Sequence, residues 1–132
     1  MKPIIFLAFL TCMRICTIAQ TQADLTATSG NDYQKADAEL NRIYRQILKD
    51  YKEDTAFIIN LKASQRIWIQ FRDAELKMKY PVRKPGFYGS VHPMCILMYL
   101  AELTQARINT LKIWTEGIEE GDVCAGSVKR KE

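Results

Sequence analysis

Histidine, cysteine, proline and glycine are all scarce in this chain of 132 residues, and each scarcity narrows the possible functions. The one histidine, His92, cannot form a metal site of the usual His/Cys spacing, so we expect no metal and no cofactor. None of the six glycines belongs to a glycine-rich phosphate loop. No stretch alternates apolar and polar residues as a half-buried strand does. Nucleotide-binding and β-sheet proteins are therefore disfavoured.

Long apolar runs are also missing. The run Ile4–Leu10 is far shorter than the roughly 20 residues that cross a bilayer. It follows the positive start Met1–Lys2 and precedes the small residues of Thr17–Ala19, a pattern typical of a secretory signal peptide over residues 1–19. The alternative is an N-terminal membrane anchor. We predict a secreted or periplasmic protein with no stable membrane insertion after cleavage.

Charge of one sign does not dominate. The formal net charge is +4, and removing Lys2 and Arg14 with the signal peptide leaves +2. The final run Lys129–Glu132 carries another +2, so the body of the domain is near neutral. A nucleic-acid partner is not expected, because such proteins usually present a basic face. The basic tail, residues 125–132, is predicted to be disordered.

The remaining pattern is helical. After a polar leader at 20–31, predicted to be flexible, apolar residues recur at spacings of three and four over 32–53, 55–79 and 93–116. Prolines and glycines cluster between the second and third of these segments. The sequence therefore predicts an all-α domain over 32–124, an antiparallel three-helix bundle with one Pro/Gly-containing loop and with Trp68 and Trp114 buried.

Each predicted helix carries polar residues where leucine would be expected. Asp37 and Asn41 do so in the first, and Arg107 in the third. The second offers Gln65 and Arg72 around a tryptophan. Inward-facing charges need partners, since a buried unpaired charge costs several kcal/mol. We expect Arg72 or Arg107 to contact an acceptor on another helix, Asp37 and Asn41 first, in a structural network. The alternatives are a functional pocket, or arginines that merely lie along the bundle edge.

Four short runs carry a resemblance: Ala36–Tyr44, Gln65–Glu75, Gly89–Ser90 and Leu103–Arg107. Together they resemble the N-terminal domain of LprI-like lysozyme inhibitors, over about residues 33–124. The motif positions that match are Asp37, Asn41, Tyr44, Gln65, Trp68, Arg72, Asp73, Thr104 and Arg107. The resemblance implies a small secreted or periplasmic helical domain, one namesake of which is associated with lysozyme inhibition. Most members have no established activity.

The cysteines depart from this family. Leu76 stands where members often have a cysteine, and Cys12 and Cys16 lie inside the predicted signal peptide without a convincing lipobox. Only Cys95 and Cys124 remain. The helix from Cys95 to residue 116 spans about 31 Å, whereas eight extended residues reach back at most about 28 Å. We predict that these two cysteines are not bonded to each other.

Two surfaces are candidates for binding a protein partner. The first is the loop between the second and third helices, with Arg83, Lys84, Phe87, Tyr88, Ser90 and His92. The second is an acidic pole at the opposite end, formed by Glu53, Asp54, Glu116, Glu119, Glu120 and Asp122. Opposite charge on either pole would steer a partner.

The sequence shows no catalytic constellation, because Ser90 and His92 have no obvious orienting acid. We predict a non-enzymatic binding protein of the cell envelope, with lysozyme as the partner that the resemblance suggests. The alternatives are a structural or assembly module of the envelope and an envelope hydrolase. The sequence predicts no oligomeric state.

Overall fold

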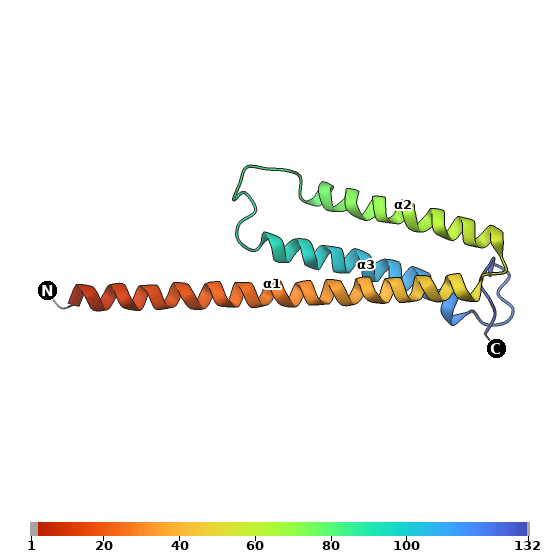
Figure 1. The fold of residues 1–132 in the computed structure, drawn as a ribbon, viewed down its shortest axis with the longest axis horizontal. Helices are drawn as coiled ribbons and strands as arrows, with labels where there is room; N and C mark the ends of the chain where they lie inside the picture. The colour runs from red at the N-terminus through yellow and green to blue at the C-terminus, as the bar shows by residue number, and fades with distance from the viewer. Residues whose placement is uncertain (1–2, 132) are drawn as a thin grey trace.

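The chain folds into three helices that run up, down and up (Figure 1). The computed structural model describes residues 3–131, with side chains from residue 21 onward. The helices are α1 (Pro3–Asp50), α2 (Thr55–Lys79) and α3 (His92–Glu116). The predicted all-α three-helix architecture is confirmed, and the bounds of α2 are those expected from the sequence. No helix within the described part of the chain is both long and apolar enough to cross a membrane.

The core lies mainly between α1 and α3, which run parallel to each other (Figure 1). Leu40, Ile43 and Ile47 recur at spacings of three and four on α1 and are buried. They form one cluster with Tyr51, Leu61, Ile108 and Leu111. Although the short connection between α1 and α2 suggests close neighbours, α3 is the main partner of α1. Two buried residues of α3, Ile108 and Leu111, join the core cluster, whereas α2 contributes Leu61.

Helix α2 is the outer helix and is anchored chiefly at its first turns. Asp54 caps it by accepting a hydrogen bond from the Phe57 amide. The Phe57 ring lies 4.6 Å from that of Tyr51 and 6.3 Å from that of Trp114, centroid to centroid. Leu61 is the buried residue of α2. Trp68 and Trp114, expected to be buried, are only half-buried at the edge of the core.

The prediction of a flexible leader at 20–31, with a helix starting near residue 32, is wrong. These residues are helical and continue α1 without a break. The hydroxyls of Thr26, Thr28 and Ser29 each donate to the carbonyl four residues earlier, so these polar side chains are satisfied within the helix. Ser29 is buried, and Gly30 lies against Leu97 of α3. Contact with α3 thus offsets the weak helix propensity of this segment.

The predicted signal peptide coincides with the first part of α1, except for residues 1 and 2, which lie outside the described residues. This part of the helix projects beyond the ends of α2 and α3 (Figure 1). Cleavage after Ala19 would remove the projecting part and leave the mature chain starting close to Gln22. The Gln22 side-chain amide lies 4.0 Å from the sulfur of Met94 on α3. The cleavage itself stays a prediction.

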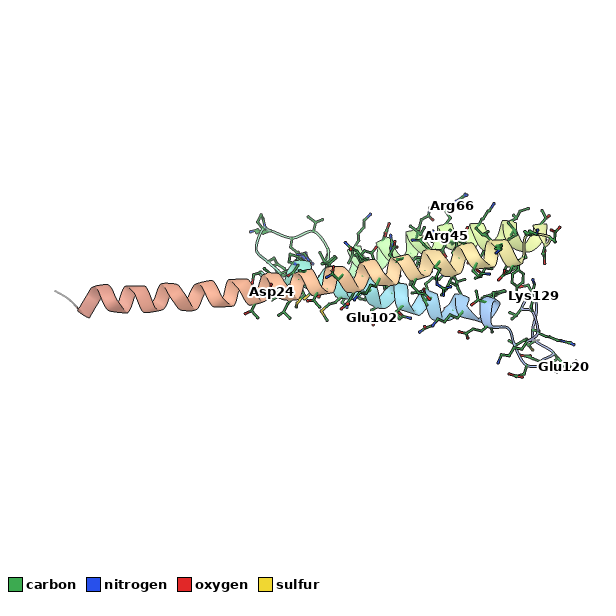
Figure 2. The ribbon with its side chains drawn as sticks, turned by 60° about the horizontal axis from the view of Figure 1, so that its bottom comes forward. Asp24, Arg45, Arg66, Glu102, Glu120 and Lys129 are labelled. Carbon is green, nitrogen blue, oxygen red and sulfur yellow. The ribbon has the colours of Figure 1, made fainter. Side chains whose placement is uncertain are left out.

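The C-terminal tail is ordered, contrary to the disorder predicted for 125–132. Residues up to 131 fold back over the end of the bundle, where Lys129 and Glu120 are found in Figure 2. The backbone of Ile118 bonds to Lys129 and Lys131 in an isolated parallel bridge. The Tyr51 hydroxyl accepts from the Lys129 amide. These contacts, which link residues distant in sequence, order a tail whose composition indicates disorder.

Cys95 and Cys124 are both free, so they are not bonded to each other, as predicted. Cys95 is half-buried on the first turn of α3, and Cys124 is exposed in the C-terminal segment. They lie near opposite ends of α3, because Cys95 is in its first turn and Cys124 follows its last residue by eight positions. The length of α3 therefore separates the two thiols, as the distances estimated from the sequence predict.

Candidate functional site

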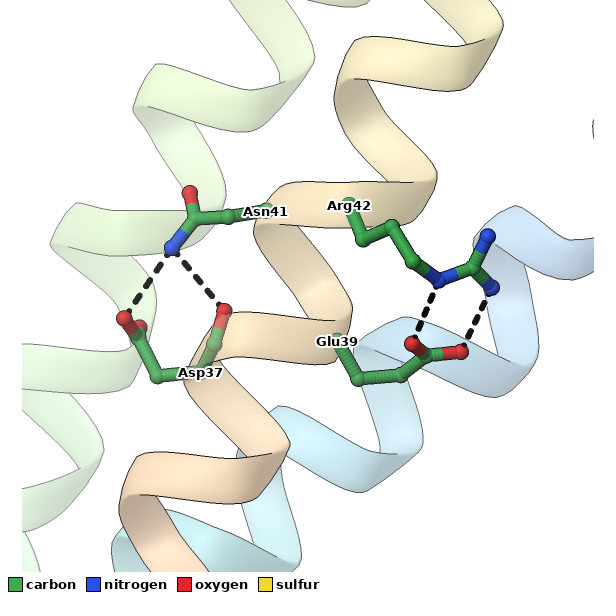
Figure 3. A network of polar contacts seen from close by, with 4 residues as sticks. All are labelled: Asp37, Glu39, Asn41 and Arg42. Atoms are coloured by element: carbon green, nitrogen blue, oxygen red, sulfur yellow. Dashed lines mark hydrogen bonds and ion pairs between the residues drawn. The ribbon is translucent and has the colours of Figure 1, made fainter.

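Two polar pairs lie on opposite sides of α1 (Figure 3). The Asn41 side-chain amide donates to the Asp37 carboxylate at 3.0 Å and to the Asp37 carbonyl at 2.9 Å. On the other side, the Arg42 guanidinium donates two bonds to Glu39, at 2.7 and 2.8 Å. This bond holds the pKa of the Glu39 carboxyl below its usual range. Sequence reasoning missed the second pair, although its i, i+3 spacing of opposite charges is a readable signal.

Arg107 links α3 to α2. Its Nε donates to the Gln65 side-chain oxygen at 3.0 Å, and a terminal nitrogen donates to the Ser64 hydroxyl at 3.1 Å. An arginine therefore does reach an acceptor on another helix, but that acceptor is on α2 and is neither Asp37 nor Asn41. Burial lowers the pKa of the Arg107 guanidinium. None of the ion pairs among the described residues involves Arg107, so its hydrogen-bond acceptors there are one amide oxygen and one hydroxyl.

Arg72 does not contact Asp37 or Asn41, the partners considered first for it and for Arg107. Arg72 donates instead to Asp73, its neighbour on α2, at 2.8 and 3.0 Å. Its guanidinium also lies 5.5 Å from the centre of the Trp68 ring, and that of Arg107 lies 6.0 Å from the same ring. Arg72 contacts a carboxylate and an aromatic face on its own helix, so its charge has partners without any residue of α1. Trp68 thus contacts two cations, a favourable arrangement for an indole.

The other motif residues have structural surroundings. Tyr44 packs against the core cluster, and Thr104 is fully buried on the face of α3 that carries Ile108. The Thr104 hydroxyl finds no hydrogen-bond partner among the described residues. A buried hydroxyl without a partner opposes folding. The Thr104 hydroxyl is therefore desolvated on folding, and no hydrogen bond among the described residues offsets the free energy of that desolvation.

We expect Thr104→Val to raise the free energy of unfolding by about 1 kcal/mol, because a methyl group replaces an unpartnered hydroxyl of the same shape. Urea denaturation with a fluorescence readout measures the change. Thr104→Ser is the matched control, since it keeps the hydroxyl and removes a methyl, and it should lower stability. A loss of stability in the valine variant would show that the hydroxyl is bonded in the folded protein.

A cleft opens between α2 and α3 beside Arg107. It has a volume of about 440 Å³, and Phe57, Leu61, Leu111 and Trp114 form its apolar wall. The C-terminal tail closes one end, where the Trp114 indole donates to the Ser127 hydroxyl at 3.0 Å. Arg107 is the motif residue that lines this partly apolar cleft. The motif residues do not form a cluster of reactive groups.

The loop between α2 and α3 is held by its own aromatic side chains. The His92 ring stacks on Tyr88 at 4.4 Å and meets Tyr80 edge-on at 5.1 Å. The Tyr88 hydroxyl donates to the Pro81 carbonyl at 2.7 Å, which ties one end of the loop to the other. Phe87 meets Tyr88 edge-on at 5.0 Å. The rings therefore give the loop a fixed shape.

The same loop is exposed and basic. Val82, near the start of the loop, is 99% exposed, and Phe87 is exposed with the Arg83 guanidinium 5.8 Å from its ring. Lys84 is exposed beside them, and the segment 80–92 contains no acidic residue. Lys79, at the end of α2, lies 3.5 Å from the Tyr99 ring. The loop thus presents cations and apolar side chains together.

The arrangement does not place Ser90 and His92 as a nucleophile and a base. Ser90 is exposed, and no hydrogen bond joins it to His92 among the described residues. The buried His92 Nε2 has no partner there, and the ring is enclosed by two tyrosines. In the same part of the chain, no three His, Cys, Asp or Glu side chains lie close enough together to hold a metal ion.

The predicted acidic pole is partly neutralised by the tail. Lys131 pairs with Glu119 at 2.6 Å, and Arg130 with Glu120 at 3.6 Å. The bond from Lys131 lowers the pKa of the Glu119 carboxyl. The Lys129 side chain reaches the Asp50 carbonyl at the end of α1. The two poles are thus unequal, because the acidic end contains its own cations and the basic loop contains no anion.

Fold and site together define a class, a small all-α domain with one fixed, exposed basic loop. A family model described as lysozyme inhibitor LprI matches residues 12–111, and the chain belongs to this family. The match includes the leader, which is continuous with α1. An uncharacterized protein of Rhizobium meliloti (strain 1021) is 35% identical over 118 residues, which cover 79% of this chain and 81% of that protein. No solved structure matches the chain.

Proposed function

We propose that the chain is an exported, non-enzymatic protein of the cell envelope that inhibits a lysozyme by inserting the loop 80–92 into its cleft. The observation that carries the proposal is the loop itself, because it is basic, exposed and fixed in shape. Glycosidases of this kind cleave their polymer with a pair of carboxylates. Cations that reach those carboxylates would form charge-assisted hydrogen bonds and keep the polymer out.

The fixed shape of the loop supports this role. A loop already ordered by ring contacts loses little conformational freedom on binding, so more of the contact energy contributes to affinity. Val82 and Phe87 supply exposed apolar contacts beside Arg83 and Lys84. Such a combination of an aromatic residue with arginine is typical of residues that dominate binding energy.

The acidic pole is the competing docking face, since lysozymes are usually basic proteins. Its carboxylates Glu119 and Glu120 already pair with Lys131 and Arg130. A partner's cations would have to displace these contacts. Docking through the loop displaces none of the ion pairs among the described residues, and the proposal therefore places the loop at the interface.

The test mixes the mature chain, residues 20–132, with lysozyme and follows the lysis of a bacterial suspension. We expect lysis to slow at a several-fold molar excess, and to slow less at moderate salt than at low salt, because salt screens charges beyond about 10 Å. An unrelated basic protein of similar size is the control. Undiminished lysis at both salt concentrations would overturn inhibition of that lysozyme. Immobilised lysozyme would then show whether the chain binds without inhibiting.

A further inference from the structure

Helix α2 carries a second apolar stripe that faces away from the core. Its members follow one another at steps of four or three residues, which places them along one side of a helix. They are Ile59, Ala63, Ile67, Phe71, Ala74 and Met78, and all six are exposed. The four large members are between 51% and 68% exposed.

This stripe is distinct from the face that α2 turns to the bundle. Phe57, Leu61 and Trp68 contribute to the core or pack against it. At about 100° per residue, the stripe is centred well over 90° around the helix from those three. Single exposed apolar residues are ordinary, but a continuous stripe on a soluble domain marks an interaction surface.

We propose that the α2 stripe is the surface through which two copies of this chain pair, with their α2 helices antiparallel. The stripe covers nineteen residue steps, about 28 Å of helix. In the antiparallel arrangement the stripe of one copy lies against the same stripe of the other copy. Ile67 meets Phe71 of the other copy, and Ala63 meets Ala74 of the other copy. Ile59 then meets Met78, so each large side chain opposes another and the small ones let the helices approach.

Charge complementarity favours the same register. Arg66 and Asp73 lie on one flank of the stripe, and the antiparallel pairing places each Arg66 opposite the Asp73 of the other copy. Arg66 is exposed, points away from the other helices (Figure 2) and makes no ion pair within the described residues. The Asp73 side chain is half-exposed although it accepts from Arg72. The two-fold axis produces this ion pair twice.

The pairing leaves the rest of the molecule accessible. Because the two α2 helices run in opposite directions, the loops 80–92 of the two copies lie at opposite ends of the dimer. The surface therefore differs from the one proposed for lysozyme, and either proposal can fail without the other.

Sedimentation equilibrium of the mature chain over a wide range of concentrations tests the pairing. We expect a monomer–dimer equilibrium that Ile67→Glu weakens at least tenfold, because a carboxylate in the stripe would be buried without a partner. Ile69→Glu is the matched control, since Ile69 is exposed on the same helix but outside the stripe. A monomer at every concentration, or equal weakening by the control, would overturn the proposal. Circular dichroism checks that both variants keep their helices.

The register is tested by exchanging the flanking charges. Arg66→Asp alone and Asp73→Arg alone should each weaken the dimer by several-fold, because each places like charges opposite one another. The double variant should restore most of the affinity. If the two losses simply add, the antiparallel register is wrong. If a lysozyme bound to the α2 stripe and prevented dimerisation, the proposal that a second copy of this chain covers the stripe would be wrong.

Discussion

Ile47→Ala should lower the free energy of unfolding by about 2–5 kcal/mol, the range for deleting most of a buried isoleucine side chain. Ile47 is 0% exposed and stands at the centre of the α1–α3 core. Small domains have only about 5–15 kcal/mol of stability in total, so the loss is a large fraction. The reason is that α3 cannot move in to fill the space without disturbing the packing of its own Ile108 and Leu111 in the same core cluster.

The matched control for that variant is Ile69→Ala on α2. Ile69 is 42% exposed, so the same change removes little buried surface there and should cost well under 1 kcal/mol. Urea unfolding followed by circular dichroism measures both variants. Similar losses at the two positions would contradict a core centred on α1 and α3 and would place α2 inside the bundle.

Reversing the charges of the loop should have the largest effect on function. If the loop docks in a lysozyme cleft, the double change Arg83→Glu and Lys84→Glu places carboxylates against carboxylates. We expect at least tenfold more protein to be needed for half-inhibition, a change of about 1.4 kcal/mol or more. The lysis assay at low salt measures the difference, because screening there is weakest.

The control changes the same amount of charge at the other end of the molecule. Arg130→Glu with Lys131→Glu alters the net charge equally but lies in the tail, where these side chains pair with Glu120 and Glu119. Inhibition by this variant should stay within about twofold of the unchanged chain, since the tail is remote from the loop. Equal losses in both variants would indicate a net-charge effect. Stronger inhibition by the tail variant would identify the acidic pole as the docking face.

Local patterns in the sequence determined the helical architecture. The i, i+3 and i+4 stripe of Leu40, Ile43 and Ile47 predicts the buried face of α1, and Pro81 marks the end of α2. The free state of Cys95 and Cys124 also follows from the sequence, because helix length alone sets how far apart they lie. Each of these inferences depends on short-range geometry.

The order of the leader and the tail could not be predicted in this way. Both segments have the composition of flexible peptide, and both are held by contacts between residues distant in sequence. Gly30 against Leu97 orders the leader, and the bonds of Lys129 and Lys131 order the tail. Such contacts depend on how α3 packs against α1 and on where the segment after α3 folds, which no local pattern specifies.

The polar partners show the same division. That Arg107 would need acceptors follows from its place in an apolar stripe, but only the tertiary structure decided that Gln65 and Ser64 supply them. Arg72 stays on its own helix because Asp73 is adjacent and Trp68 is one turn away. The packing of α3 against α2 brings the Arg107 guanidinium to about 3 Å from Gln65 and Ser64. Sequence therefore determined which side chains require partners, and helix packing determined which partners they find, because a hydrogen bond requires its two atoms to meet within about 3.2 Å.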